Sequence, residues 1–182
     1  MKTTIIGTLC AIALIALTES PRLRANESDP LSPHVRSSDS EIRALVAEGE
    51  ARSPTFRALI ARIEQSDGVV HVEWRPCPVP GMLGCLPNWM NDAGAARFIR
   101  INLACRKSPR DRQIKTLAHE LQHAVEALAD PHVRTSAALR SLFLRIGTES
   151  GSRSYETSEA VRIGELAARE LSAAPVSADA AR

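Results

Sequence analysis

Lysine, aromatic side chains and long apolar runs are scarce in this 182-residue chain. Positive charge is carried by 20 arginines and only three lysines, interleaved with acids, and the net charge is +2. No basic block of five or more residues exists, and aromatic residues make up only 3% of the chain. Because nucleic-acid binding relies on clustered cations, often with stacking aromatics, the composition does not indicate a nucleic-acid partner.

The longest apolar run, Ile5–Leu17, is too short to cross a bilayer, because a helical span needs roughly 20 residues. It follows the basic Lys2 and precedes a polar stretch, which is typical of a secretory signal peptide. We expect residues 1–25 to be that signal, with a cut after Ala25 as one option, and the mature protein to be secreted or periplasmic. A short anchor or a buried helix is the alternative, so a membrane is expected only through an uncleaved signal segment.

The rest of the chain divides by composition into three parts. Residues 26–40 are polar and interrupted by proline, which predicts a linker. Residues 172–182 are small and polar, which predicts a flexible tail. Residues 41–171 have the length of one domain, and no internal repeat is visible.

The cysteines lack the close C-x₂₋₄-C spacing of a thiolate zinc site. Cys10 would leave with the signal, and thiols outside the cytosol tend to pair. Cys77 and Cys85 bracket a loop rich in proline and glycine that can bring them together. We predict a Cys77–Cys85 disulfide that leaves Cys105 buried or reactive, with Cys85–Cys105 pairing as the alternative.

Apolar spacing predicts a small α+β domain that is mostly helical, with a short β-sheet preceding the helix that carries a HELQH motif. The expected strands are Val69–Trp74 and Arg97–Ala104, separated by a long loop, Arg75–Gly94. Five helices are expected. The first follows Ser40, and the second runs from Pro54 towards Gly68. The third runs from Pro109, after an N-cap at Ser108, to Asp130, the fourth ends at Gly147, and the last runs from about Tyr155 to Leu171.

The HELQH motif, His119–His123, carries the chemistry of the chain. Residues four apart share one face of a helix, so both imidazoles can reach one ion, and neutral imidazole is a favoured ligand of Zn²⁺. Glu120 projects about 100° away, where it can take a proton from a water on the metal and deliver it to a leaving amine. The motif requires a helix, which the apolar stripe predicts. Two histidines hydrogen-bonded at a helix surface are the ordinary alternative.

A catalytic zinc takes three protein ligands and keeps one position open, so a third ligand must come from elsewhere. At helical spacing Glu156 falls within the apolar stripe of the last helix, where a carboxylate needs a partner such as a metal. Glu159 lies nearer the edge of this stripe and is the second candidate, while Asp130 and His132 are weaker ones. A first-turn glutamate favoured by the helix dipole is the other interpretation of Glu156.

With HELQH and a downstream helix bearing Glu156 or Glu159, the chain resembles the gluzincin type of zinc metallopeptidase. It is also similar to small bacterial proteins in which HELQHA is followed by ETxxA. The resemblance covers roughly residues 69–171. It implies a zincin-like fold, with His119, His123 and Glu156 as Zn²⁺ ligands, Glu120 as general base and a peptide or protein as substrate.

Two further expectations come from the resemblance. Such enzymes use a tyrosine or histidine to stabilise the oxyanion, but Tyr155, the only tyrosine, is expected to point away because its neighbour Glu156 points to the metal. The strand Arg97–Ala104 is expected at an edge of the sheet, where it would pair with extended substrate.

The sequence therefore predicts an exported, monomeric metallopeptidase that hydrolyses peptide bonds with a metal-activated water. One alternative is a non-catalytic zinc-binding or interaction domain of the cell envelope. Another is a helical envelope protein whose histidines bind no metal.

Overall fold

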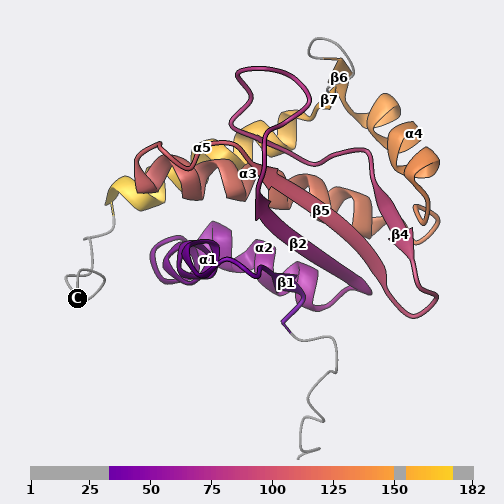
Figure 1. The fold of residues 1–182 in the computed structure, drawn as a ribbon, viewed down its shortest axis with the longest axis horizontal. Helices are drawn as coiled ribbons and strands as arrows, with labels where there is room; N and C mark the ends of the chain where they lie inside the picture. Colours follow the sequence, from indigo (N-terminus) through magenta and orange to yellow (C-terminus); the bar gives the residue numbers. More distant parts are fainter. Residues whose placement is uncertain (1–32, 150–154, 174–182) are drawn as a thin grey trace, which may run out of the picture.

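The computed structural model describes residues 33–149 and 155–173, and this part of the chain folds as an α+β domain (Figure 1). The predicted fold class is confirmed. The expected signal peptide, residues 26–32 of the expected linker and residues 174–182 of the expected tail lie outside the described residues. The main sheet has the order β1-β2-β5-β3, with β4 also paired to β5, and its strands are β1 (Val35–Arg36), β2 (Gly68–Trp74), β3 (Gly84–Cys85), β4 (Met90–Asp92) and β5 (Arg97–Leu103).

Most helices begin at side chains that accept hydrogen bonds from their first free N–H groups. Asp39 caps α1, Ser53 caps α2 ahead of Pro54, and Thr135 caps α4. None of the helices in the described ranges combines the length and the apolar character of a membrane span. The helices are α1 (Ser40–Arg52), α2 (Pro54–Glu64), α3 (Arg110–Ala129), α4 (Ser136–Ile146) and α5 (Ser158–Ala173), and a small ribbon is formed by β6 (Thr148–Glu149) and β7 (Tyr155–Glu156).

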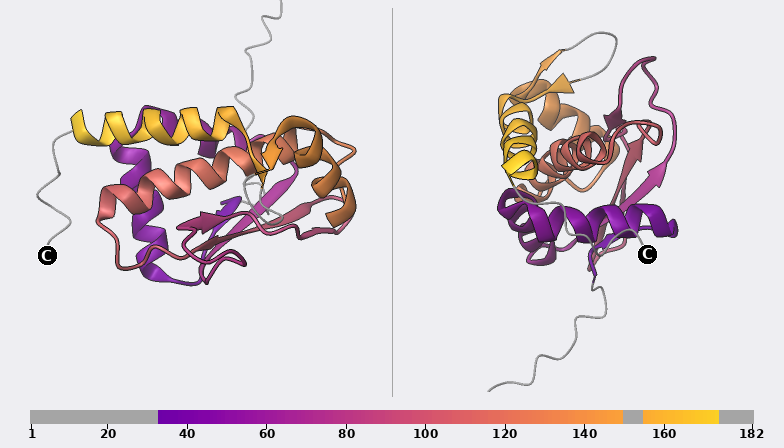
Figure 2. Two further views of the ribbon diagram at one scale, coloured as in Figure 1. Left: turned by 90° about the horizontal axis from the view of Figure 1, so that it is seen from above. Right: turned by 90° about the vertical axis from the view of Figure 1, so that its left-hand side faces the viewer.

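The sheet packs its apolar face against the helices. β1, β2 and β5 run parallel, with Val70 opposite Ile99 and Val72 opposite Ile101, and all four of these side chains are fully buried. Figure 2 shows α3 lying between the sheet and α5, so that α3 has protein on both sides. This position explains the length of the apolar stripe on α3, and it holds the HELQH segment firmly in the core.

The sheet begins earlier than expected, inside the segment predicted as a linker. Val35 and Arg36 pair with Val70 and His71 in the parallel register. His34 is also buried, and its Nδ1 lies 3.1 Å from the carbonyl oxygen of Ile63. Two residues are too few to show a strand periodicity, so only the pairing with β2 reveals this strand.

The prediction that Arg97–Ala104 is an edge strand is wrong. The strand, β5, has β2 on one side and the antiparallel strands β3 and β4 on the other. The physical reason is the segment expected as a long loop, which folds back and pairs twice with β5. β3 and β4 consequently form the edge on that side of the sheet.

The predicted disulfide between Cys77 and Cys85 is confirmed. It ties the start of the connection after β2 to β3, with the two Cα atoms 5.9 Å apart. Cys105 is a free thiol, buried as expected, and burial raises its pKa. The thiol therefore contributes to packing and is not a reactive surface group.

Both ends of α3 are fixed by side chains. At its start, Pro109 and not Ser108 holds the N-cap position, and the Gln113 side chain donates to the Arg106 and Ser108 carbonyls at 2.8 and 3.0 Å. At its end, Arg97 on β5 is only 2% exposed and donates to the terminal carbonyls of the helix and the following turn. Because these carbonyls have no partner within the helix, Arg97 anchors α3 to the sheet.

Candidate metal centre

α3 presents His119 and His123 one turn apart on one face of the helix, and both line a cleft together with Cys85 of β3. The His119 side chain is 21% exposed, whereas that of His123 is 7% exposed. The two rings meet edge to face with centroids 4.9 Å apart, and His123 also packs edge to face against Phe143 of α4 at 5.3 Å. The imidazole orientations are thus fixed by packing as well as by helical spacing.

Glu156 joins these histidines, but it does not belong to the last helix as expected. It lies on β7, which pairs with β6 in an antiparallel ribbon. The helix begins only after Thr157, whose hydroxyl accepts the Ala160 N–H at 3.1 Å and so acts as the N-cap. Glu156 thus reaches the histidines from the chain that leads into α5, and its position depends on this ribbon.

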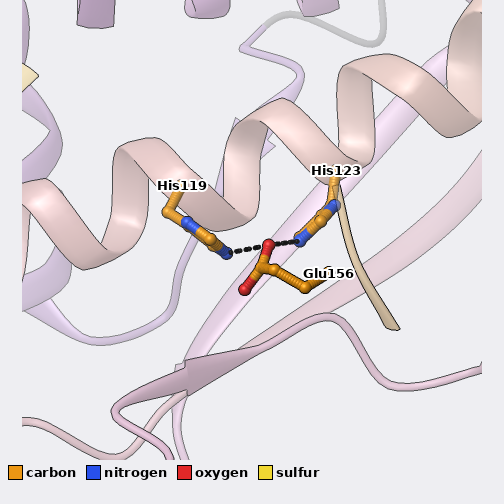
Figure 3. A group of neighbouring side chains, drawn as sticks. All are labelled: His119, His123 and Glu156. Atoms are coloured by element: carbon orange, nitrogen blue, oxygen red, sulfur yellow. Dashed lines mark ion pairs between the residues drawn. The ribbon is translucent and has the colours of Figure 1, made fainter. Parts of the chain in front are cut away.

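The three donor groups converge on one point (Figure 3). Nε2 of His119 and Nε2 of His123 lie 3.1 and 3.4 Å from the same oxygen of Glu156, Oε1. In a tetrahedral site with ligand bonds of 2.0–2.1 Å, neighbouring donor atoms are about 3.3 Å apart. All the donor atoms lie within 4.8 Å of one another, so the group can hold a metal ion with little rearrangement.

Electrostatics bind the three groups together when no cation is present. Burial lowers the pKa of His123, but the carboxylates of Glu126 and Glu156 outweigh burial and raise it to about 9. Burial raises the pKa of Glu156, but the two histidines outweigh it and lower the pKa to about 2. Both shifts favour an ion pair between His123 and Glu156, and a metal cation at this point would satisfy the same carboxylate.

Glu126 forms a second layer behind His123. Its Oε2 lies 3.1 Å from Nδ1 of His123, and its side chain is 12% exposed. Thr157 donates its hydroxyl to the same carboxylate at 2.9 Å, and the Gln122 amide donates at 3.2 Å. A carboxylate at Nδ1 fixes the tautomer that leaves Nε2 free for a metal, which is the usual support of a metal-bound histidine.

Glu120 is 5% exposed and lies next to the metal-binding group. Burial raises its pKa, and the two histidines and the backbone N–H of Leu86 oppose that rise. Gly84 of β3 lies against this side chain, because a Cβ there would come within 2.9 Å of it and within 2.6 Å of Thr116. The close approach of β3 therefore requires glycine and holds Glu120 beside the histidines.

The group opens into a cleft of about 1020 Å³. One wall is the apolar loop that the disulfide closes, with Val79 and Met82 among its side chains, together with Leu86 directly after Cys85. The other wall comes from α4 and β7. Tyr155 lines this cleft together with Glu156, so the expectation that it points away is wrong. The three donor groups therefore lie in a cleft that has an apolar wall and a polar one.

The other candidate ligands lie outside the group. Glu159 is engaged by Arg162 at 2.7 and 2.8 Å, and Asp130 lies 3.6 Å from Arg145. His132 is exposed in the turn after α3 and also does not belong to the group. None of these three residues belongs to the group formed by His119, His123 and Glu156.

The sequence prediction missed Glu126 and Thr157 as supporting residues. The position of Glu126, three residues after His123, was a usable indication, because residues three apart on a helix are neighbours. The indication for Thr157 was weaker, since it rested only on a threonine directly before a helix.

We compared the chain with models of protein families, with curated proteins and with solved structures, and none of them matched it.

Proposed function

We propose that this protein is an exported, zinc-dependent metallopeptidase of the gluzincin-like type. The observation that carries the proposal is the convergence of His119, His123 and Glu156 at a cleft, with the buried carboxylate of Glu120 beside them. Three ligands and an open side are what a catalytic zinc site requires, whereas a structural site closes with four. Export is supported by the Cys77–Cys85 disulfide, because such bonds persist in oxidising compartments.

The donor set favours zinc over calcium or magnesium. Two imidazole nitrogens and one carboxylate oxygen suit Zn²⁺ or a similar transition metal, whereas Ca²⁺ and Mg²⁺ prefer oxygen ligands alone. When bound, Zn²⁺ supplies Lewis-acid polarisation of a carbonyl group and eases the ionisation of water. The carboxylate of Glu126 supports this assignment, because it sets His123 to offer Nε2.

Glu120 would manage the proton of the reaction. As the water oxygen bonds to the carbonyl carbon of the substrate, Glu120 accepts the proton that the water gives up. As the C–N bond breaks, the same carboxyl group delivers this proton to the departing nitrogen. The products are a carboxylic acid and an amine, which become a carboxylate and an ammonium group at neutral pH, and Glu120 returns to its starting state. Tyr155 is the hydroxyl donor in the cleft lining that is suited to the oxyanion.

The test combines metal analysis with one conservative variant. The purified mature protein should contain about one zinc per chain, and the His119→Ala and His123→Ala proteins should lose it. Glu120→Gln should keep the metal and the fold but lose hydrolysis of a peptide library. Bound zinc without hydrolysis of any peptide would instead support a non-catalytic zinc-binding or interaction domain. If both histidine variants kept wild-type metal content, the proposed site would be wrong.

A further inference from the structure

Arg140 carries the positive charge of the polar wall of the cleft. Among the described residues that line this cleft, it is the only arginine or lysine. It stands on α4 one turn before Phe143, the residue whose ring packs against His123. Residues three apart share a helix face, so α4 turns Arg140 and Phe143 towards the same space. Arg140 is thus placed beside the metal-binding group without being part of it.

The guanidinium of Arg140 has no carboxylate partner among the residues that the structure describes. The two cleft carboxylates are engaged elsewhere, because Glu156 contacts the two histidines and Glu120 is buried against β3. By contrast, Arg134, just before the same helix, has two aspartate partners, and Arg145 near its end faces Asp130. Arg140 therefore differs from its neighbours in keeping a cation available in the cleft.

The charges around a metal-bound site bear on the role of Arg140. The carboxylates of Glu120 and Glu156 in the lining, and that of Glu126 behind His123, would offset the charge of a bound Zn²⁺. Arg140 is the one arginine or lysine that the described part of the cleft lining adds to this group. A cleft with low-dielectric walls concentrates its field, and the opposite wall, with Val79 and Met82, is apolar. An anionic group entering this space finds one cationic side chain that can pair with it.

We propose that Arg140 binds a carboxylate of the substrate, so that this enzyme prefers peptides carrying a carboxylate close to the scissile bond. This inference rests on the proposed peptidase function and names its substrate class. The planar guanidinium matches a carboxylate through two parallel hydrogen bonds, which a lysine cannot reproduce. The carboxylate is either the C-terminus of the peptide or an acidic side chain next to the cleaved bond, and the experiment separates these two sources.

The experiment compares three forms of one fluorogenic peptide library. The first has neutral side chains and a C-terminal amide, the second has a free C-terminus, and the third carries one glutamate at each position in turn. Wild-type enzyme should cleave one of the two carboxylate forms about tenfold better than the amide, mainly through a lower KM, since a charged hydrogen bond contributes at this level. A preference for the second form identifies the C-terminus, and one for the third identifies an acidic side chain.

The variants assign the preference to Arg140. Arg140→Gln should reduce the ratio of kcat/KM between carboxylate and amide peptides to near one, and Arg140→Lys should restore part of it. Arg145→Gln removes the same charge from the same helix outside the cleft lining, so it should keep the wild-type ratio. If Arg140→Gln lowers kcat equally for all three forms, the residue acts on the oxyanion or on the fold, and the inference is overturned.

A binding measurement separates this inference from the peptidase proposal. In the zinc-loaded Glu120→Gln protein, labelled carboxylate peptides should bind about tenfold more tightly than amides by fluorescence anisotropy. Adding Arg140→Gln should remove the difference. If no peptide is hydrolysed by the wild type, the peptidase proposal fails, and this measurement alone decides the role of Arg140. Equal dissociation constants for carboxylate and amide peptides would overturn that role even if the wild type hydrolyses peptides.

Discussion

The hydroxyl of Thr157 lies 2.9 Å from a carboxylate oxygen of Glu126, which joins the start of α5 to α3. Glu126 also holds Nδ1 of His123, and Thr157 directly follows Glu156 in the chain. One hydrogen bond therefore couples two candidate ligands that come from distant parts of the sequence. The candidate metal centre thus has a buried second layer, and removing that layer should affect metal binding before it affects the fold.

The first prediction concerns this second layer. Glu126→Gln should weaken zinc binding by about 10-fold to 100-fold, because the amide holds the His123 imidazole less firmly than a carboxylate does. Competition with a chromogenic chelator measures the affinity. Glu165→Gln is the matched control, since it removes an exposed carboxylate of α5 that pairs with Lys115. Indistinguishable affinities of the Glu126→Gln protein and this control would show that Glu126 does not support the metal.

The second prediction concerns metal removal. Zinc at 100 times its dissociation constant should stabilise the wild-type fold by about 2.7 kcal/mol, and a chelator should reverse the gain. The metal-free protein should still unfold cooperatively, because the ligands stand on elements that the core already holds. Thermal unfolding monitored by circular dichroism provides the measurement. His119→Ala should show the same metal-free transition without the zinc-dependent rise, and a rise of wild-type size in that variant would argue against the site.

The third prediction concerns Tyr155. If its hydroxyl donates to the developing oxyanion, Tyr155→Phe should lower kcat by about 100-fold or more while KM and zinc content stay unchanged. Steady-state kinetics on the best library peptide, together with metal analysis, provides both numbers. A Tyr155→Phe enzyme with wild-type kcat would show that another group stabilises the transition state.

The fourth prediction concerns the disulfide that ties the apolar wall of the cleft. Replacing both Cys77 and Cys85 by serine should cost about 2–3 kcal/mol of unfolding free energy, mainly because the short loop is no longer closed in the unfolded chain. Urea unfolding measures this loss. Reductant should destabilise the wild type by a similar amount and leave the double variant unchanged. An equal effect of reductant on both proteins would point to Cys105 or to another cause.

The fifth prediction concerns acid stability at Asp67. Burial raises its pKa, but hydrogen bonds and charge from Arg97 and Arg134 outweigh burial, so its pKa is lowered in the folded protein. This stabilisation is fully present above the unfolded pKa of about 3.9 and is lost as the pH falls through the lower folded value. Urea unfolding between about pH 2 and pH 5 should show a shallower loss of stability for Asp67→Asn than for the wild type. Parallel curves for the two proteins would exclude Asp67 as a source of the pH dependence.

Local sequence patterns determined the motif helix and what it can bind. The apolar stripe that includes Leu117 and Leu121 predicted α3, and its spacing put His119 and His123 on one face. The proline- and glycine-rich segment between Cys77 and Cys85 likewise predicted their disulfide, because it closes a short loop. In each case the residues involved are close in sequence. Helix geometry therefore places the two histidines on one face, and a short loop brings the two cysteines together.

Glu156 shows where local patterns stop being sufficient. Its spacing relative to Ala160 and Ile163 fits a helix, yet Thr157 caps the helix and the ribbon with β6 takes Glu156 instead. The predicted residue does lie beside the two histidines, but it stands on β7 and not on the predicted helix. A partly buried carboxylate needs a partner whether it stands on a helix or on a strand, because burying an unpaired charge is costly. This cost depends on the residue and not on the element that carries it.

The sequence by itself therefore determined the donor types, the helix that carries two of them and the disulfide. Only the tertiary structure decided that β5 is central, that Glu126 supports His123, and that Arg140 and Tyr155 share the cleft with Glu156. Most of these relationships join segments that are far apart in the chain. The contact of Glu126 with His123 lies within one helix, but only the surrounding elements show which side of that helix is buried. These relationships depend on the order of the strands and on packing between elements. The periodicity of a single segment does not show either of them.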